Sequence, residues 1–186
     1  MMTTPILDTR LAKLDELRWH VGQTPLYRMD SLSANPKVQI LAKLEWQQLG
    51  GSVKARPAYN MLWNAATSGA LRGRRLLDAS SGNTGIAYAI FAAACGIPVT
   101  LCVPENASKE RKHILRSLGV DLVLTSPFES TDGAQEVAKE MALKQPDLYH
   151  YVDQYGNDAN WQAHYHHTGV EIWEETHRKV THFVAG

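Results

Sequence analysis

Strand-like and helix-like segments alternate along the chain after residue 37, and this alternation restricts the fold more than any other feature. Strands are predicted at 38–44, 76–79, 99–103, 121–125, 148–152 and 182–185, and helices at 54–68, 84–95, 109–118, 131–144 and, in part, 160–177. Such spacing predicts βαβ units, and hence an α/β protein with a mostly parallel sheet. Ligands bind these sheets at the carboxyl ends of the strands, so the loops that follow the strands hold the candidate site.

Small and polar residues mark where several of these helices begin and end. Glycines follow three of the predicted helices, at Gly69, Gly96 and Gly119. Ser108 is a predicted N-cap, and Thr131 or Asp132 is the predicted N-cap of the helix that runs to residue 144.

The composition excludes several classes of function. With 186 residues, 44% of them hydrophobic and 20% charged, the chain has a globular rather than a disordered or fibrous profile. Its 19 basic and 19 acidic residues cancel, which gives no electrostatic footprint for nucleic acid or an anionic membrane. Residues 79–104 carry no charge, but residues 96–98, Gly-Ile-Pro, interrupt them. We therefore expect a buried helix and a buried strand there, not a membrane span.

Cysteine usage and the N-terminal sequence predict a cytoplasmic protein. Cys95 and Cys102 form no CxxC pair and are predicted to be buried thiols in a reducing compartment. Residues 1–16 lack the apolar core of a secretory signal.

Residues 49–54, Leu-Gly-Gly-Ser-Val-Lys, place a lysine where a glycine-rich loop enters a helix. Pro57 fits best in the first helical turn, so Lys54 falls at the positive end of the helix dipole. A positive neighbourhood disfavours the charged ammonium, and a lysine activated in this way forms Schiff bases or acts as a base. The phosphate-binding pattern G-x-x-x-x-G-K-[ST] is not matched. The alternative interpretation is a solvated lysine at a helix start.

Residues 80–85, Ser-Ser-Gly-Asn-Thr-Gly, follow a predicted strand and begin the next helix. Backbone N–H groups at such a turn bind carboxylate or phosphate, and the side chains of Ser80, Ser81, Asn83 and Thr84 add donors. An ordinary capped turn uses the same residue types. Together with Lys54, however, the segment favours a pyridoxal phosphate (PLP) enzyme that acts on an amino acid.

At this point the chain resembles the cysteine synthase family, the O-acetylserine sulfhydrylases of PLP fold type II, and most closely the cysteine synthase B branch. The matching segments run in order from about residue 15 to the last residue. They are GQTPL at 22–26, GSVKARP at 51–57, SSGNTG at 80–85, VPEN at 103–106, DQYGNDAN at 153–160 and TGVEI at 168–172. The resemblance implies a three-layer αβα architecture of the tryptophan synthase β type, with a second domain.

The resemblance also implies the reaction and its residues. Lys54 would hold PLP through a Schiff base and later move the substrate α-proton, and Asn83 would hydrogen-bond the ring hydroxyl of PLP. The substrate carboxylate would be bound by Ser80, Ser81, Gly82, Thr84 and Gln154. The implied reaction is β-replacement, in which a sulfide donor and an O-activated L-serine, either O-acetylserine or O-phosphoserine, give L-cysteine. A homodimer is implied for the intact enzyme, without nucleic acid or membrane partners.

The chain departs from the family pattern at Ala55, where the family has Asp, at Ser80, where it has Thr, and at Asp158, where it usually has Pro. An acid at position 55 would contribute about 0.3–1 kcal/mol through the helix dipole. Residues 35–150 are expected to form the complete smaller domain, and 1–34 and 151–186 part of the larger, PLP-binding one. The family's phosphate-binding loop would begin at Gly186. The chain is therefore expected to be the N-terminal portion of such an enzyme, and to bind PLP weakly or not at all on its own.

Other interpretations stay open. The chain could belong to a cystathionine β-synthase or a serine/threonine dehydratase-like PLP enzyme, or be a non-catalytic remnant, which Ala55 and the early end favour. Histidines invite a metal site: His150, His164, His166, His167 and His177. No cysteine or carboxylate stands at ligand spacing, so we expect surface and packing histidines and no metal.

Overall fold

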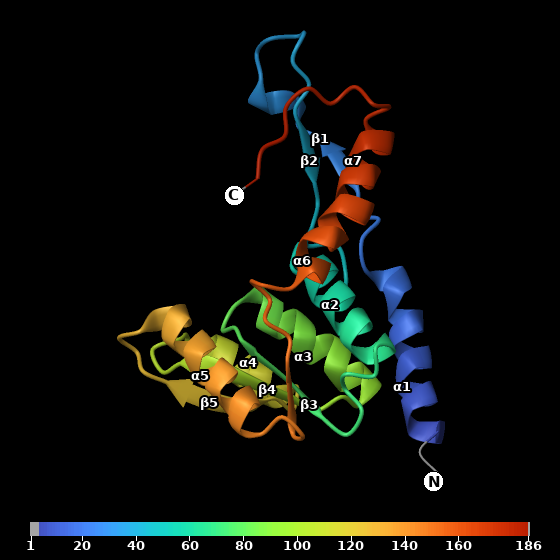
Figure 1. Ribbon diagram of the computed structural model, residues 1–186. Coiled ribbons are helices and arrows are strands. Elements are labelled where there is room, and N and C mark those ends of the chain that lie inside the picture. The colour runs from blue at the N-terminus through green and yellow to red at the C-terminus, as the bar shows by residue number, and fades with distance from the viewer. Residues whose placement is uncertain (1–3, 186) are drawn as a thin grey trace.

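The computed structural model describes residues 4–185, and its centre is a four-stranded parallel sheet (Figure 1). The strands are β3 (Arg75–Ala79), β4 (Val99–Pro104), β5 (Asp121–Thr125) and β6 (Tyr149–Tyr151). Their order is β5-β4-β3-β6, so β3 and β4 are central. Leu77 of β3 lies opposite Thr100 of β4 and Tyr151 of β6. The predicted parallel sheet is confirmed.

Helices cover both faces of the sheet. One face carries α2 (Ala55–Thr67), α3 (Asn83–Cys95) and α4 (Lys109–Ser117), and the other carries α5 (Ser130–Lys144). Successive side chains of a strand point to opposite faces, so Leu76 is buried in the core of the first face and Leu77 in that of the second. The predicted three-layer architecture is confirmed.

The uncharged stretch 79–104 forms the end of β3, the whole of α3 and the strand β4. Gly96 ends α3 in the left-handed conformation (φ 66°), as predicted. None of the helices in residues 4–185 is long and apolar enough to cross a membrane.

The two predicted N-caps have different outcomes. Ser108 caps α4, since its hydroxyl accepts a hydrogen bond from the backbone N–H of Arg111 at 3.2 Å. The N-cap predicted at Thr131 or Asp132 is wrong. The helical bonding begins at Glu129, whose carbonyl accepts from the N–H of Gly133 at 3.0 Å, and both predicted residues lie inside α5.

The N-terminal segment contains elements that the sequence analysis did not predict. Helix α1 (Thr4–Leu17) packs on the sheet's first helical layer through Leu14, which is fully buried. Strand β1 (Leu26–Arg28) pairs antiparallel with β2 (Leu41–Lys43). The strand predicted at 38–44 is therefore shorter than expected and lies in a hairpin outside the parallel sheet. Short 3-10 helices occupy Arg18–His20 and Asp30–Leu32.

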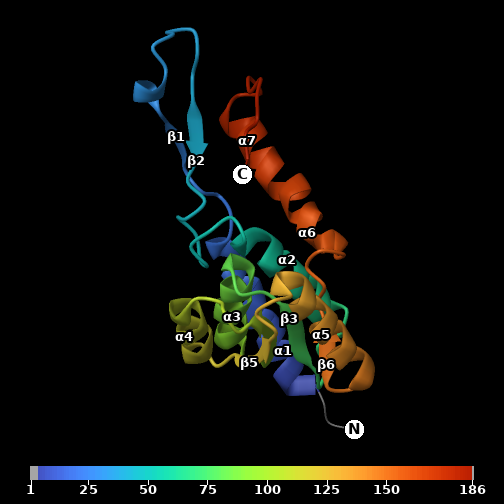
Figure 2. The same cartoon turned by 90° about the vertical axis from the view of Figure 1, so that its left-hand side faces the viewer.

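After β6 the chain forms one long helical segment in three parts. These are α6 (Asp158–Ala163), a π-helical turn (His164–Thr168) and α7 (Gly169–Glu175). In the π turn the N–H of Gly169 donates to the carbonyl of His164, one residue beyond the α-helical partner. This segment and the β1–β2 hairpin project side by side from the α/β body (Figures 1 and 2).

The strand predicted at 182–185 is wrong. The apolar run is there, but Phe183 is 71% exposed and Val184 92% exposed. A strand needs a neighbour for its N–H and C=O groups, and none of the described segments pairs with this one. Gly186, where the phosphate-binding loop was expected to begin, lies outside the described residues.

Candidate active site

Residues 80–85, which we call the Ser80 loop, connect β3 to α3 and close on their own first residue. The Ser80 hydroxyl oxygen accepts hydrogen bonds from the N–H of Gly85 at 3.0 Å and, more weakly, of Gly82 at 3.4 Å. A Cβ on Gly85 would lie 2.5 Å from the Ser80 carbonyl oxygen, so only glycine fits there. Contacts within the loop itself therefore hold its shape.

The Ser80 loop leaves the N-terminus of α3 open to a ligand. Gly82 is the N-cap and has no side chain, and the Ser80 hydroxyl accepts the first-turn N–H of Gly85. Thr84 is buried and Asn83 is exposed, with Ser81 half-buried before them. The free N–H groups and the dipole of a 13-residue helix favour an anion at this end. Five of the seven predicted site residues are thus brought together in one turn.

Gln154 ties a second loop to the end of β3. Its Nε2 donates to the carbonyl oxygen of Ala79 at 2.8 Å, and the side chain is 8% exposed. The amide of Asn160 in turn donates to the Gln154 carbonyl at 2.6 Å. The structure therefore places Gln154 beside the Ser80 loop, with one of its amide N–H groups bonded to the Ala79 carbonyl. Its predicted role in carboxylate binding stays a prediction.

Lys54 is the N-cap residue of α2, and its side chain is exposed. Its own N–H donates to the Ser52 hydroxyl at 3.3 Å, and the N–H of Ala55 donates to the Ser52 carbonyl at 3.0 Å. Pro57 is the third residue of the helix, within the first turn as predicted. We call residues 49–54 the Lys54 loop.

A glycine brings the Lys54 loop against α3. Gly50 has a φ of 99°, and a Cβ on it would lie 3.1 Å from the Cβ of Ala55 and 3.6 Å from the Cβ of Ala87. Since Ala87 is in the second turn of α3, the starts of α2 and α3 lie close together at one edge of the sheet. This convergence fits a cofactor held by Lys54 and a substrate carboxylate held by the Ser80 loop.

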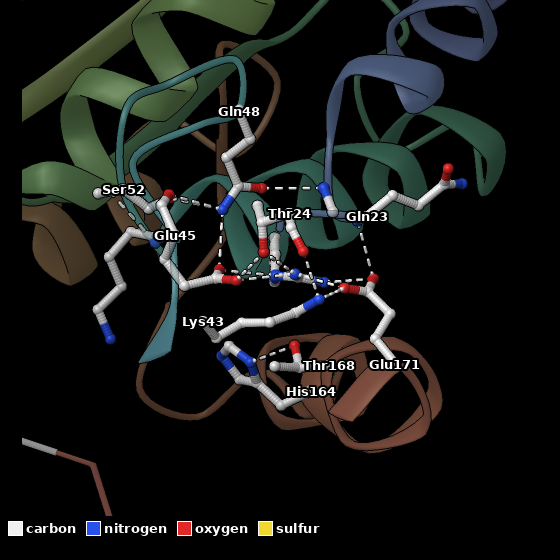
Figure 3. Close-up of polar contacts among 12 residues, drawn as sticks. Gln23, Thr24, Lys43, Glu45, Gln48, Ser52, His164, Thr168 and Glu171 are labelled. Atoms are coloured by element: carbon white, nitrogen blue, oxygen red, sulfur yellow. Dashed lines mark hydrogen bonds and ion pairs between the residues drawn. The ribbon is translucent and has the colours of Figure 1, made fainter. Parts of the chain in front are cut away.

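The second residue of α2 is a buried arginine that the sequence analysis left without a role. Arg56 is 3% exposed, and its guanidinium is held between the carboxylates of Glu45 and Glu171. It makes two hydrogen bonds to each carboxylate, all at 2.7–2.8 Å. Figure 3 shows Glu45 and Glu171 facing one another across this arrangement. Bidentate contacts of this kind are among the strongest hydrogen bonds that side chains make.

Further polar groups extend the arrangement, which we call the Arg56 cluster: Thr24, Lys43, Glu45, Gln48, Arg56, Glu171 and Glu175. Lys43 Nζ donates to the Thr24 carbonyl at 2.6 Å and to Glu175 at 2.7 and 2.8 Å. Glu171 also accepts from the N–H of Gln23 at 3.0 Å. The cluster thus joins the turn before β1, the strand β2, helix α2 and helix α7 (Figure 3).

The charges of the cluster set the protonation of its carboxylates. Burial would raise the pKa of Glu171, but hydrogen bonds from Arg56, the Gln23 amide and Lys43 lower it to about 2. Burial would likewise raise the pKa of Glu45, but the hydrogen bonds from Arg56 and Thr24 outweigh burial and lower it. Both groups are therefore carboxylates at neutral pH, and the cluster stays charged.

The sequence offered one signal for this cluster. Three of its members lie in the segments that carry the family resemblance but had no chemical role there: Thr24, Arg56 and Glu171. An uncommitted polar residue in each of several ordered motifs indicates a shared structural partner.

Asp78 is a buried acid beneath the Ser80 loop. It is 1% exposed, and its Oδ1 accepts from the N–H of Ala79 at 2.8 Å. Its Oδ2 is buried and finds no well-aligned donor among residues 4–185. Burial raises the pKa of Asp78 to about 7, although the Ala79 amide and the Tyr88 hydroxyl lower it. Asp78 therefore takes up a proton near neutral pH.

His164 lies in the π turn and feels the charges of Lys54 and Arg56 at the start of α2. Its Nδ1 is 3.0 Å from the Thr168 hydroxyl oxygen. Burial, followed by the positive charges of Lys54 and Arg56, lowers its pKa. The described residues contain no group of three or more His, Cys, Asp or Glu side chains arranged to hold a metal ion. Cys95 and Cys102 are buried free thiols, and burial raises the pKa of Cys102 to about 11.

The fold defines the class of the protein, which is the α/β fold of PLP fold type II, and the site adds a lysine at one helix start and a turn of small polar residues at the next. Residues 17–186 match the family model described as pyridoxal-phosphate dependent enzyme. The chain belongs to this family, and the expected cysteine synthase resemblance is confirmed.

Similar proteins carry cysteine synthase names. A cysteine synthase of Aquifex aeolicus is 49% identical over 170 residues, which are 89% of this chain and 52% of that protein. Cysteine synthase B of Pseudomonas aeruginosa is 42% identical over 166 residues, 89% of this chain and 55% of that one. The crystal structure of an Entamoeba histolytica cysteine synthase superposes with a TM-score of 0.80 and 33% identity, covering 97% of this chain and 51% of that one. The chain spans about half the length of these relatives.

Proposed function

We propose that this chain supplies the cofactor lysine and the substrate-carboxylate turn of a PLP-dependent cysteine synthase. The observation that carries the proposal is the close approach of the Lys54 loop to the second turn of α3 at Gly50, and it supports a site that Lys54 shares with the Ser80 loop. Family membership supports PLP as the cofactor. Because the relatives are about twice as long, the activity of a whole protein, its substrates and its partners all belong to this proposal.

Each site residue has a part to which its position is suited. The exposed amine of Lys54 would bind PLP covalently, and the exposed amide of Asn83 would hydrogen-bond the ring hydroxyl. The N–H groups at the start of α3, with the hydroxyls of Ser81 and Thr84, would hold the substrate carboxylate. When bound, PLP supplies an electron sink for the substrate α-carbon. Lys54 would then take the α-proton as a base.

Gln154 could take part without giving up its contact to the backbone. Its Nε2 carries two N–H donors, and the Ala79 carbonyl accepts from one of them. The second N–H would donate to a substrate oxygen.

The reaction that the site supports best is replacement of the β-substituent of O-acetylserine or O-phosphoserine by sulfide, giving L-cysteine. Names of the relatives favour it over cystathionine formation or dehydration. We place residues 35–150 in the smaller domain, and 1–34 and 151–186 in part of the larger one. A cytoplasmic homodimer is the proposed working form of the intact enzyme, and the two buried free thiols suit a reducing compartment.

Covalent trapping tests the proposal directly. The intact enzyme is incubated with PLP, reduced with borohydride and mapped by mass spectrometry. We expect Lys54 to carry the pyridoxyl group in preference to the exposed Lys109. We expect Lys54→Met to abolish the label on the peptide that contains residue 54. Equal labelling of Lys54 and Lys109 would contradict a PLP site at Lys54. Cysteine formation from O-acetylserine, O-phosphoserine or serine with sulfide, with Lys54→Met as the blank, then tests the substrate class.

A further inference from the structure

Gln48, a member of the Arg56 cluster, also contacts the Lys54 loop, and both its amide oxygen and its amide nitrogen make hydrogen bonds. Its Oε1 accepts from the N–H of Gly22 at 2.9 Å. Its Nε2 donates to the Glu45 carboxylate at 2.8 Å, to the Glu45 carbonyl at 3.0 Å and to the Ser52 carbonyl at 3.1 Å. One side chain therefore contacts the turn before β1, the cluster and the loop that carries Lys54 (Figure 3).

The contact at Ser52 bears on Lys54. The same Ser52 carbonyl that accepts from Gln48 accepts the first-turn N–H of Ala55, and the Ser52 hydroxyl accepts the N–H of Lys54. The two residues before Ser52 are Gly50 and Gly51, which have φ values of 99° and 64°. Glycines restrict the backbone less than other residues do. The side-chain contact from Gln48 therefore adds to the backbone hydrogen bonds that fix Ser52.

At its other end Gln48 contacts a rigid group. The Glu45 carboxylate accepts two hydrogen bonds from Arg56 and one from the Thr24 hydroxyl at 2.7 Å. The guanidinium is also held by Glu171 of α7, so Glu45 cannot move without breaking buried, charge-assisted bonds. A continuous path of hydrogen bonds runs from α7 through Arg56, Glu45 and Gln48 to Ser52.

We propose that Gln48 is a positioning residue for Lys54, holding the Lys54 loop at a fixed orientation relative to Glu45 and the turn before β1. Its importance for catalysis rests on the proposed function, whereas its effect on the loop does not. The chemistry suits glutamine. A glutamate would add a carboxylate beside Glu45 and could donate to neither oxygen, and asparagine is one methylene shorter.

The test compares Gln48→Leu with Gln47→Leu. Gln47 is the adjacent residue, is exposed, and has no hydrogen-bond partner for its side chain among the described residues, so it is a matched control. The first readout is amide hydrogen exchange at Lys54 and Ala55, with the amides of α3 as reference. We expect exchange about tenfold faster in Gln48→Leu, roughly the effect of one lost hydrogen bond, and α3 unchanged within about twofold.

The second readout is the ratio of Lys54 to Lys109 label after PLP and borohydride treatment. We expect the ratio to fall severalfold in Gln48→Leu and to stay at the wild-type value in Gln47→Leu. Wild-type exchange at Lys54 and Ala55 in Gln48→Leu overturns the proposal. So does equal acceleration in the α3 amides, which would show general destabilisation instead.

The outcomes separate this proposal from the proposed function. If the wild type shows no preference for Lys54, the PLP site fails, while the exchange data still decide whether Gln48 holds the loop. If Gln48→Leu does not fold, Gln48→Asn is used. It keeps the donor and acceptor but is too short to reach both partners. Amide exchange is therefore expected to be faster than in wild type and in Gln47→Leu at Lys54 and Ala55 only. No rise there overturns the proposal.

Discussion

The Lys54 loop and the Ser80 loop both lead from a strand into a helix at the same edge of the molecule, yet they are held in different ways. The Ser80 loop is closed by its own serine hydroxyl and by a glycine that leaves no space for a Cβ. The Lys54 loop depends on Gln48 and on the Arg56 cluster, whose contacts join residues up to 148 positions apart.

This difference separates local from long-range preorganisation. A loop that binds a substrate anion needs its N–H groups fixed, and contacts within six residues achieve that. A loop that carries a reactive lysine must be fixed relative to the rest of the molecule, because the lysine must meet a substrate bound elsewhere. Buried ion pairs between distant segments provide that second kind of order.

Removing Arg56 is expected to have the largest effect, because it disrupts the long-range contacts that distinguish the Lys54 loop from the Ser80 loop. We expect Arg56→Met to lower the free energy of unfolding by about 3–5 kcal/mol, because it removes the cation that pairs with the Glu45 carboxylate and one of the two cations that pair with Glu171. Urea unfolding at pH 7 measures the change. The triple variant Glu45→Gln, Arg56→Met, Glu171→Gln removes the unpaired charges and should regain part of the loss. A loss below about 1 kcal/mol in the single variant would show that the cluster does not order this region.

The pH dependence of stability sharpens the contrast, because the acids beside the two loops are shifted in opposite directions. Asp78 has a folded pKa of about 7, above its ordinary value of 3.8, so the folded protein holds a proton that the unfolded chain releases. Stability from this group rises as the pH falls from 7 toward 4, by up to about 1.4 kcal/mol per pH unit. Glu171 has a pKa lowered to about 2, so its contribution is complete above about pH 4.5 and is lost as the pH falls toward 2.

Asp78→Asn isolates the first effect. It keeps the acceptor for the Ala79 N–H but cannot titrate. Unfolding free energies measured at several values between pH 4 and 7 should converge for variant and wild type at the acid end and diverge toward pH 7, with Asp78→Asn the more stable there. Parallel curves would contradict the raised pKa.

The smallest expected effect is on the Ser80 loop. Ser80→Ala removes the acceptor for the Gly85 N–H and should lower the free energy of unfolding by about 1 kcal/mol. Ser81→Ala is the matched control, since the described residues offer its hydroxyl no hydrogen bond, and it should leave stability unchanged. Urea unfolding of both variants makes the comparison. Equal losses in the two would mean that Ser80 does not close the loop.

The parallel sheet, its helices and the Ser80 loop could be predicted because their signals are local. Alternating strand and helix patterns fix the sheet, and Ser-Ser-Gly-Asn-Thr-Gly contains the residues that close its own turn. Helix α1 had a usable signal, Leu11, Leu14 and Leu17 at helical spacing, that was not recognised.

The Arg56 cluster could not be predicted in the same way. Glu171 lies 115 residues from Arg56, and no periodicity in the chain connects them. The apolar run at 182–185 shows the converse: strand-like composition does not make a strand where no described segment pairs with it.

The π turn at His164–Thr168 determines which way α7 faces. Its wider hydrogen-bonded ring accommodates one residue more than an α-helical turn, between α6, which packs on α2 through Ala159 and Ala163, and the carboxylate of Glu171. Each residue of an α-helix turns the chain by about 100°. The wider ring absorbs the surplus residue, and the same residues wound as a regular α-helix would rotate α7 relative to α6 and turn Glu171 away from Arg56. The alignment of two distant charges thus depends on the width of this turn as well as on residue identity in the cluster.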